Sequence, residues 1–321
     1  MNDQPVSRVA APAEGAAPDA AAAAPGTAPR AIEPGGSVAR NRPSPNTVAS
    51  RSAPLYLRHA LPVRIMHWIN VIALTLMFMS GLQIFNSHPA LYWGNTSYSG
   101  RPAWLEIGAK EDARGRPIGY TRLFGHEFVT SGVLGISSDD GQTYAQGFPS
   151  WLTVPSHQWL AMARSWHFFF AWVFLINGLC YVAYTIWSRH LARDLWPTRA
   201  DIRGIGASIL DHLRFRHPTG EAAKRYNVLQ KIAYVTVIFV LLPLIILMGL
   251  GMSPRLDTLF GGWVGWFGGR QSVRSIHFLV AWALAAFVLI HVFEVIVTGL
   301  WNNLRSMING RYRVPGEASH R

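Results

Sequence analysis

The sequence predicts an all-α membrane protein built as a bundle of four transmembrane helices. Half of the 321 residues are hydrophobic and only 14% are charged, well below the quarter that is typical of soluble domains. Four apolar runs are each long enough to cross a bilayer, for which about 20 residues suffice. Asp is absent from all four runs, and their few charged residues lie near the ends. The runs also lack the polar face that a soluble amphipathic helix would show.

The expected spans cover residues 62–85, 165–187, 228–250 and 275–299. An external loop at 86–164 and a cytoplasmic loop at 188–227 join them, and the whole membrane domain covers residues 55–321. Residues 1–54 are rich in Ala, Pro and Gly and lack hydrophobic periodicity, which predicts a disordered cytoplasmic tail. We expect no signal peptide in this tail, because Pro and Asp interrupt its alanine tract and no basic start leads into a Leu-rich core.

The basic residues indicate how the spans are oriented, because the cytoplasmic flanks of membrane helices collect Lys and Arg. Residues 189–231 include nine basic and four acidic side chains, and Arg residues precede the first span and follow the fourth. Residues 86–164 are balanced, with six of each. We therefore expect a multi-pass protein of the bacterial inner membrane with both termini cytoplasmic. Topology and anionic lipid then account for the net charge of +12, and no nucleic-acid partner is expected.

The external loop is too long, at about 80 residues, to be a simple connection between two helices. It contains the stretches "LYWGNTSYSGRPAW" and "QGFPSWLTVP", which are rich in Trp, Tyr and Gly. This composition predicts ordered turns and a surface on which another subunit docks.

Four of the twelve histidines lie inside the expected spans, where an ionisable group is costly and is a candidate for function. His167 and His277 are each the third residue of a run that enters from the external side. His67 is the sixth residue of a run that enters from the cytoplasm, and His291 lies eight residues before the cytoplasmic end of its run. By depth, the four form two pairs: His167 with His277, and His67 with His291. The other histidines fall in loops or the tail, where solvent exposure is the simpler interpretation.

The spacing within the fourth span supports two stacked sites. His277 and His291 are fourteen residues apart, over which a helix turns through about 1,400° and rises about 21 Å, so they share one face. The second span reads "RSWHFFFAW" and the fourth "RSIHFLVAW", which share the pattern R-S-x-H-F-x-x-A-W. Two helices that run in the same direction thus present His167 and His277 in matched local sequences.

Two opposed imidazole pairs inside an apolar bundle favour haem iron as the ligand. Axial ligation by two histidines leaves no open coordination position, which suits electron transfer. Zinc or copper would need further ligands, which the spans do not offer. Arg64, Arg164 and Arg274 each stand three residues before a span histidine and are candidate partners for haem propionates. The alternative is that these Arg side chains are ordinary flanking charges that reach the lipid headgroups.

Two further features bear on this cofactor. Cys180 is the single cysteine and no C-x-x-C-H motif occurs, which excludes covalently attached haem and a cysteine-ligated iron–sulfur cluster. Gly81, Gly178 and Gly249 lie within the spans, where glycine allows close approach of a flat ligand. Close packing of a neighbouring helix explains these glycines equally well.

Several stretches of the spans resemble a known family. They are "RIMHWIN" and "SGLQIF" in the first span, "RSWHFFFAWVFLINGLCY" in the second, "RYNVLQK" at the third and the two-histidine fourth span. Over about residues 57–304 they are similar to the prokaryotic di-haem cytochrome b family, of the cytochrome b561 type. That family supplies membrane subunits of nickel–iron hydrogenases, formate dehydrogenases and thiosulfate reductases. The resemblance implies two haem b groups, with His67–His291 at the cytoplasmic haem and His167–His277 at the other.

The resemblance also implies electron exchange with quinone near the cytoplasmic haem. "RYNVLQK" resembles a segment of the quinone pocket in formate dehydrogenase members, which makes Asn227 and Gln230 candidates. Leu229 departs from the family pattern, because those members have glycine there. Helix capping by Asn227 is the alternative interpretation. Glu294, one turn beyond His291, is a candidate proton relay to quinone, or else an acid near a helix end that meets water.

We expect a transmembrane electron-transfer subunit that passes electrons between membrane quinone and a periplasmic redox enzyme. No nucleotide-binding loop, metal–cysteine motif or nucleophile arrangement occurs in the sequence. The catalytic centre is therefore expected on a partner subunit, and the resemblance to thiosulfate-reductase-type members suggests a molybdenum enzyme. Two alternatives stay open: a standalone quinol oxidase or reductase with a small soluble acceptor, and a non-redox transporter whose histidines relay protons.

Overall fold

The computed structural model describes residues 55–97, 102–139, 141–188, 196–214, 227–259 and 262–313. The expected disordered tail, residues 1–54, lies outside these ranges, as do residues 189–195 and 215–226 of the expected cytoplasmic loop. All described residues belong to one folded unit, Ser52–Arg321.

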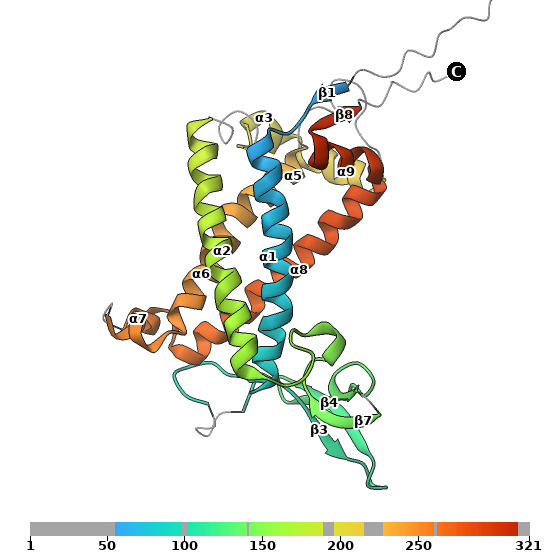
Figure 1. Cartoon of the computed structure of the whole chain (residues 1–321), viewed down its shortest axis with the longest axis vertical. Coiled ribbons are helices and arrows are strands. Elements are labelled where there is room, and N and C mark those ends of the chain that lie inside the picture. Colours follow the sequence, from blue (N-terminus) through green and yellow to red (C-terminus); the bar gives the residue numbers. More distant parts are fainter. Residues whose placement is uncertain are drawn as a thin grey trace, which may run out of the picture. The chain divides into compact units, whose positions relative to one another are not determined.

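Four long apolar helices form the membrane bundle (Figure 1): α1 (Leu61–Asn86), α2 (Leu160–Trp187), a continuous third span made of α5 (Val228–Thr236), a π turn (Val237–Leu241) and α6 (Leu242–Gly251), and α8 (Arg270–Val297). The shortest has 24 residues and, at about 1.5 Å per residue, exceeds the hydrocarbon thickness of about 30 Å. The predicted four-helix membrane bundle is confirmed. α2 and α8 each begin five residues before the expected span (160 against 165, and 270 against 275). The expected spans start after Arg164 and Arg274, where the apolar runs begin, whereas the helices include these arginines and the turn before them.

Pro243 explains the π turn in the third span. Proline has no backbone N–H, and its ring clashes with the carbonyl four residues back in a regular α-helix. The helix therefore widens over Val237–Leu241, where the N–H of Leu242 donates to the carbonyl of Val237. Such turns accommodate a local break without ending the helix.

The helices pack most closely as two pairs, α1 with α2 and α6 with α8. Asn177 of α2 ties the first pair together, because its amide donates to the carbonyl of Met66 at 2.9 Å and to Oδ1 of Asn70 at 2.7 Å. Apolar side chains fill the second pair. Between the pairs, rings meet across the bundle, as where Phe78 of α1 lies 5.3 Å, centre to centre, from Trp282 of α8.

The segment between α1 and α2, residues 87–159, is here called the sheet segment, and it lies at one end of the bundle, the sheet end (Figure 1). Its antiparallel sheet has the order β2-β3-β4-β5, formed by β2 (Ala90–Leu91), β3 (Leu105–Glu111), β4 (Pro117–Leu123) and β5 (His126–Val129). β6 (Gly135–Asp139) and β7 (Gln142–Gln146) form a hairpin, and a 3-10 turn follows at Ser150–Leu152. The sequence predicted ordered turns here but not strands, because burial alternates only over the first residues of β3.

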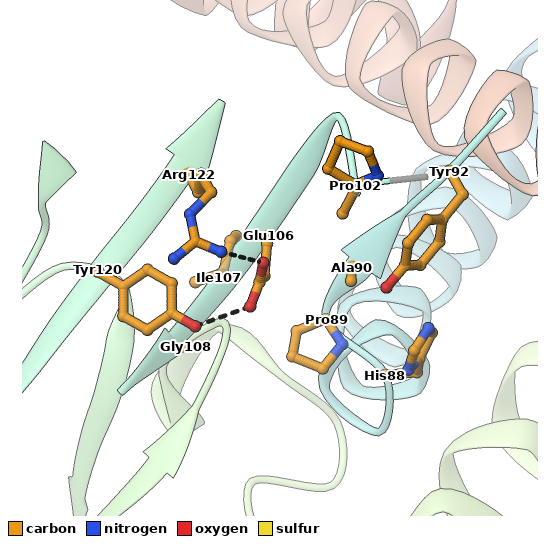
Figure 2. Close-up of a pocket in the computed structure, with 11 residues that line it drawn as sticks. His88, Pro89, Ala90, Tyr92, Pro102, Glu106, Ile107, Gly108, Tyr120 and Arg122 are labelled. Carbon is orange, nitrogen blue, oxygen red and sulfur yellow. Dashed lines mark hydrogen bonds and ion pairs between the residues drawn. The ribbon is translucent and has the colours of Figure 1, made fainter. Parts of the chain in front are cut away.

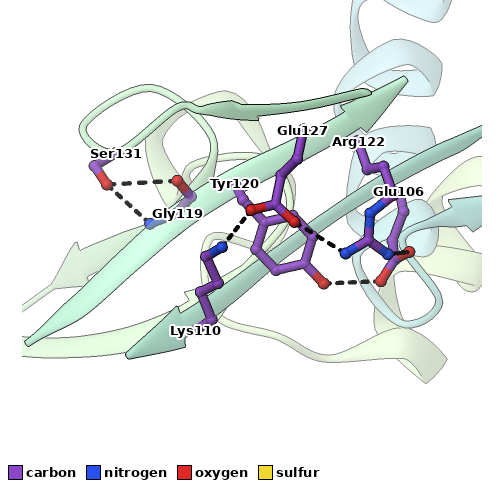
Figure 3. Close-up of polar contacts among 7 residues, drawn as sticks. All are labelled: Glu106, Lys110, Gly119, Tyr120, Arg122, Glu127 and Ser131. Atoms are coloured by element: carbon purple, nitrogen blue, oxygen red, sulfur yellow. Dashed lines mark hydrogen bonds and ion pairs between the residues drawn. The ribbon is translucent and has the colours of Figure 1, made fainter. Parts of the chain in front are cut away.

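Charged side chains join three strands of this sheet (Figure 3). Arg122 of β4 donates to Glu106 of β3 at 2.8 Å and to Glu127 of β5 at 2.9 Å. Lys110 also pairs with Glu127, and the Tyr120 hydroxyl donates to Glu106 at 2.8 Å. The hydrogen bonds from Lys110 and Arg122 hold the pKa of Glu127 below its usual range. Cross-strand pairs of this kind help to fix the register of neighbouring strands.

Asn86, the last residue of α1, fastens the sheet segment to the bundle. Its amide donates to the carbonyl of Phe148 at 3.1 Å, and its Oδ1 accepts from the N–H of Phe148 at 2.7 Å. The amide also donates to Gln83 at 3.0 Å. The ring of Phe148 then packs against Phe85 of α1 and Phe278 of α8. The helices therefore hold both the backbone and the side chain of Phe148.

Asn86→Leu is expected to loosen the sheet segment. The substitution leaves the buried N–H and carbonyl of Phe148 without partners, and each buried unpaired group costs about 1–3 kcal/mol. Limited proteolysis of the purified protein should show faster cleavage within residues 102–139. Asn86→Asp keeps the acceptor but loses the donor, so it should lie between wild type and Asn86→Leu. Equal cleavage rates in all three proteins would show that the anchor lies elsewhere.

The opposite end of the bundle, here called the terminal end, holds the strands β1 (Leu55–Leu57) and β8 (Arg311–Arg313), which pair antiparallel, and helix α9 (Leu300–Asn309) (Figure 1). Arg64 and Trp68 of α1 donate to the carbonyls of Ile308 and Met307 at 2.6 and 3.1 Å. These bonds satisfy carbonyls that the end of a helix leaves unpaired. Trp301 of α9 is exposed, as expected for a helix that lies at a membrane interface.

Short helices complete the fold: α3 (Arg199–Arg203), α4 (Ile205–Leu213), α7 (Pro254–Leu259) and a 3-10 turn at Trp263–Phe267. Asp201 of α3 accepts a hydrogen bond from Lys231 of α5 at 2.8 Å. It also accepts bonds from the N–H and the hydroxyl of Thr198 at 2.8 and 2.9 Å. These bonds, that of Lys231 first, lower the pKa of Asp201 to about 2. Asp201 thereby links α3 to the start of the third span.

Acid is expected to release α3 from α5. Because the folded state depresses the pKa of Asp201 from 3.8 to about 2, the ion pair stabilises the fold above about pH 4, and this contribution is lost as the pH falls towards 2. Pepsin cleavage within residues 196–214 should therefore accelerate over that range in the wild type. Asp201→Asn removes the titrating group and should flatten the pH profile. Superimposable profiles would show that Asp201 does not control this contact.

Candidate functional site

The four membrane histidines lie in two pairs inside the bundle. The rings of His167 (α2) and His277 (α8) have centres 6.3 Å apart at an angle of 64°. The rings of His67 (α1) and His291 (α8) also have centres 6.3 Å apart, at 68°. Each pair thus joins α8 to one helix of the α1–α2 pair. The first is here called the sheet-end pair and the second the terminal-end pair.

Hydrogen bonds orient both rings of the sheet-end pair. Nδ1 of His167 lies 3.0 Å from the carbonyl of Met77 and 3.3 Å from the hydroxyl of Ser80, and Nδ1 of His277 lies 3.0 Å from the carbonyl of Ile245. A carbonyl can only accept, so the bonds to Met77 and Ile245 require the proton on Nδ1 of each ring. Nε2 then keeps its lone pair, which is the state that a metal-binding imidazole needs.

Glycine backbones face the same two rings. A Cβ atom placed on Gly81 of α1 would lie 3.4 Å from Cε1 of His167, and one placed on Gly249 of α6 would lie 3.5 Å from Cε1 of His277. A Cβ on Gly178 would meet nothing within 4 Å. Gly81 and Gly249 therefore leave room for the rings of His167 and His277 beside the backbones of α1 and α6. Gly178 leaves open space beside α2.

The terminal-end pair has aromatic neighbours that sequence reasoning did not find. Phe287 stacks on His291, with ring centres 6.0 Å apart at 16°, and the ring of Tyr234 of α5 meets Phe287 edge-on at 6.4 Å. Trp68 meets His67 edge-on at 5.5 Å. The available signal was the position of Phe287, four residues before His291 and hence on the same helix face.

The three arginines of the R-x-x-H pattern have different surroundings. Arg64 donates to the carbonyl of Ile308 at the terminal end. Arg274 donates to the carbonyls of His88 and Ala90 in the sheet segment. Arg164 is exposed, and its guanidinium lies 5.6 Å from the ring centre of Phe168. The shared spacing therefore does not produce one shared set of contacts.

The three residues proposed from the sequence to contact quinone, Asn227, Gln230 and Glu294, also have different surroundings. Asn227 and Gln230 form a capping box at the start of α5, in which Oε1 of Gln230 accepts from the N–H of Asn227 at 3.3 Å. This is the capping role that the sequence left open as the alternative for Asn227. Glu294 is half-buried on α8, and Tyr234 of α5 contacts Phe287 of the same helix. Tyr234 follows Gln230 by four residues, so the two share a helix face.

A depression of about 510 Å³ opens on the sheet segment (Figure 2). His88, Ala90 and Tyr92 line one side, and Glu106 and Arg122, already bonded to each other, line the other. Burial, and then the nearby charge of Arg274, lower the pKa of His88 and favour its neutral form. The stretch that forms this wall also supplies the carbonyls bound by Arg274.

The residues present fit haem iron better than a multi-ligand metal site. A bond of about 2 Å from each imidazole nitrogen to one shared metal ion, added to the distance from each nitrogen to its own ring centre, comes close to the observed 6.3 Å. In the part of the chain that the structure describes, no three His, Cys, Asp or Glu side chains are grouped to hold a metal. Each pair therefore offers two ligands, which is the axial set of a haem.

Comparison with known proteins agrees with the resemblance drawn from the sequence. Residues 58–310 match the family model described as prokaryotic cytochrome b561. The chain is also 25% identical over 245 residues to the "Putative protein-methionine-sulfoxide reductase subunit YedZ1" of Azospira oryzae, a match that covers 75% of this chain and 91% of that protein. The family resemblance is thereby confirmed. The chain belongs to the prokaryotic cytochrome b561 family, whose members bind haem b within a bundle of membrane helices and serve in electron transfer.

Proposed function

We propose that the chain is the membrane subunit of a quinone-linked oxidoreductase complex and holds two haem b groups. His167 and His277 would hold one of them, and His67 and His291 would hold the other. The observation that carries the proposal is the equal ring separation of 6.3 Å in both pairs, at two levels of α8 about 21 Å apart. Bound haem b supplies an iron that takes up and releases one electron, and two imidazole ligands leave it no open position for a substrate.

Guanidinium groups at the terminal end are suited to bind propionates. Nε of Arg64 and Nε of Arg305 are both buried and have no hydrogen-bond partner among the residues that the structure describes. A buried N–H without an acceptor is unusual and costly, and a carboxylate is a strong acceptor for guanidinium. We assign Arg64 and Arg305 to the terminal-end haem and the exposed Arg164 to the sheet-end haem. Arg274 is less available, because two of its N–H groups bind backbone carbonyls.

Tyr234 and Glu294 are the side chains best suited to meet a quinone at the terminal end. Phe287 stacks on His291 and meets Tyr234 edge-on, and Glu294 lies one turn beyond His291 on the same helix, which supports this assignment. A phenol hydroxyl can donate a hydrogen bond to a quinone carbonyl, and a carboxyl group can exchange a proton with it. Asn227 and Gln230 begin the same helix, but capping already uses their side chains.

Charge supports a cytoplasmic terminal end in a bacterial inner membrane. Arg64, Arg305, Arg311 and Arg313 all lie there, as expected of a cytoplasmic flank. The sheet segment is then external and offers a surface to a periplasmic redox enzyme. Because the name of the A. oryzae relative describes a subunit of a methionine-sulfoxide reductase, a reductase of that substrate class is the proposed partner. A molybdenum cofactor in the partner remains an expectation from the family resemblance.

The purified protein in detergent tests this proposal. The reduced-minus-oxidised spectrum should be that of a b-type haem, and pyridine extraction should give two haems per chain. Added decylubiquinol should reduce a part of the haem that dithionite reduces completely. A folded but colourless preparation would overturn the haem assignment. Haem that dithionite reduces and decylubiquinol does not would count against the proposed link to quinone.

A further inference from the structure

The sheet segment supplies the cap at the start of α8. The first N–H groups of a helix have no partner within it, and the N-cap residue Gly269 has no side chain with which to satisfy them. The carbonyl of Gly94 accepts instead from the N–H groups of Gln271 and Ser272, at 2.9 and 3.2 Å. The N–H of Gly94 donates in return to the hydroxyl of Ser272 at 2.8 Å. Chain from outside the bundle thus fixes the first turn of α8.

The same stretch, residues 88–94, here called the strap, also holds the second turn. Arg274 donates to the carbonyls of His88 and Ala90 at 2.5 and 2.7 Å. The hydroxyl of Ser275 donates to the carbonyl of Tyr92 at 2.7 Å. The strap therefore binds α8 on both residues that lie two and three positions before His277.

Trp104 closes the contact from the other side of Ser275. Its indole N–H donates to the Ser275 hydroxyl at 3.0 Å, and Ser275 is 0% exposed. The Trp104 ring stacks with Trp93 and Phe124, whose ring centres lie 5.9 and 5.7 Å away. Those two residues are 45% and 69% exposed. A continuous row of aromatic rings thus leads from the surface of the sheet segment to a buried hydroxyl two residues from His277.

The matching sequence in α2 makes no such contacts with the described part of the chain. Ser165 stands where α8 has Ser275, two residues before a pair histidine, but its hydroxyl donates to the carbonyl of Ala161 in its own helix at 3.0 Å. Ser165 and the neighbouring Arg164 are exposed. The two R-S-x-H motifs are therefore alike in sequence, yet among the described residues the sheet segment binds the motif of α8 and not that of α2.

We propose that Trp104 and Ser275 are positioning residues for His277 and that, through it, the sheet segment sets the environment of the sheet-end haem. This role rests on the proposed ligation of haem iron by His277. A local displacement of the second turn of α8 at Ser275 carries the His277 ring, two residues further on, with it. His291 lies about 21 Å further along the helix and has contacts of its own with His67 and Phe287, so a local displacement at Ser275 leaves its ring in place.

The experiment compares Ser275→Ala and Trp104→Phe with the matched control Ser165→Ala in the full-length, haem-loaded protein. Trp104→Phe keeps an aromatic ring but removes the N–H donor. Electron paramagnetic resonance of the oxidised protein resolves low-spin haems by their g values, and a redox titration resolves their midpoint potentials. The sheet-end signal is first identified as the one that His277→Ala and His167→Ala both abolish.

Ser275→Ala and Trp104→Phe are expected to displace or broaden the sheet-end signal and to shift its midpoint potential, while the terminal-end signal stays as in wild type. Ser165→Ala should leave both signals unchanged. Wild-type signals in Trp104→Phe, or equal changes at both haems, would overturn the positioning role. If Ser275→Ala does not accumulate, Trp104→Phe decides alone. A wild-type protein without two resolved haem signals would instead overturn the proposed function.

Discussion

Replacing His277 with alanine is expected to remove the haem at the sheet end and to leave the one at the terminal end in place, whereas His291→Ala is expected to do the reverse. The two histidines share α8, yet His277 faces His167 and His291 faces His67. On the proposed ligation, removing either imidazole would take away one of the two haem ligands at one site only. Haem content should therefore fall from two to about one per chain in each variant.

Four single variants make this a test of pairing as well as of ligation. His167→Ala should match His277→Ala in the potential of the haem it retains, and His67→Ala should match His291→Ala. Pyridine extraction gives the haem content, and a redox titration followed by absorbance identifies the haem that remains. His126→Ala, on the exposed strand β5, is the control and should retain both haems. Loss of the same haem from His277→Ala and His291→Ala would show that the pairing is wrong.

The helical part of the fold could be predicted because the bilayer imposes it locally. A run of apolar residues must form a helix to pair its backbone groups in lipid, so the four spans could be identified without any long-range contact. The sheet depends on contacts between residues far apart in the sequence, such as Arg122 with Glu106 and Glu127. No single strand is apolar or regular enough to reveal this arrangement. Pro243, in contrast, was a readable sign of a local break in the third span.

The positions of the histidines could be predicted from depth and helical period, because both are fixed by the span that carries them. The contacts of the arginines could not, since the partners of Arg274 lie in the strap, more than 180 residues earlier in the chain. The roles of Asn227 and Gln230 could be predicted in part. Their spacing is that of a capping box, so the sequence contained the capping interpretation that the structure shows.

Gly81→Leu is expected to empty the sheet-end haem site, while Gly81→Ala is expected to retain both haems. A Cβ at Gly81 would lie 3.4 Å from Cε1 and 3.6 Å from Nδ1 of His167, so a methyl group fits at van der Waals distance. The further carbons of leucine would occupy the space of the ring itself. The ring cannot yield freely, because its Nδ1 is held at 3.0 Å by the carbonyl of Met77, on the same helix as Gly81. Overpacking at such a position costs about 1–3 kcal/mol.

The matched substitution on the other side of the pair is Gly249→Leu, because a Cβ there would lie 3.5 Å from Cε1 of His277. Both leucine variants should keep one haem per chain, with the redox potential of the haem that His277→Ala retains. Gly81→Leu with two haems of wild-type potential would mean that the His167 ring has another place to go. In that case the backbone of α1 does not hold the His167 ring in position. The hydrogen bond between His167 and the carbonyl of Met77 would then follow from the position of the ring and would not determine it.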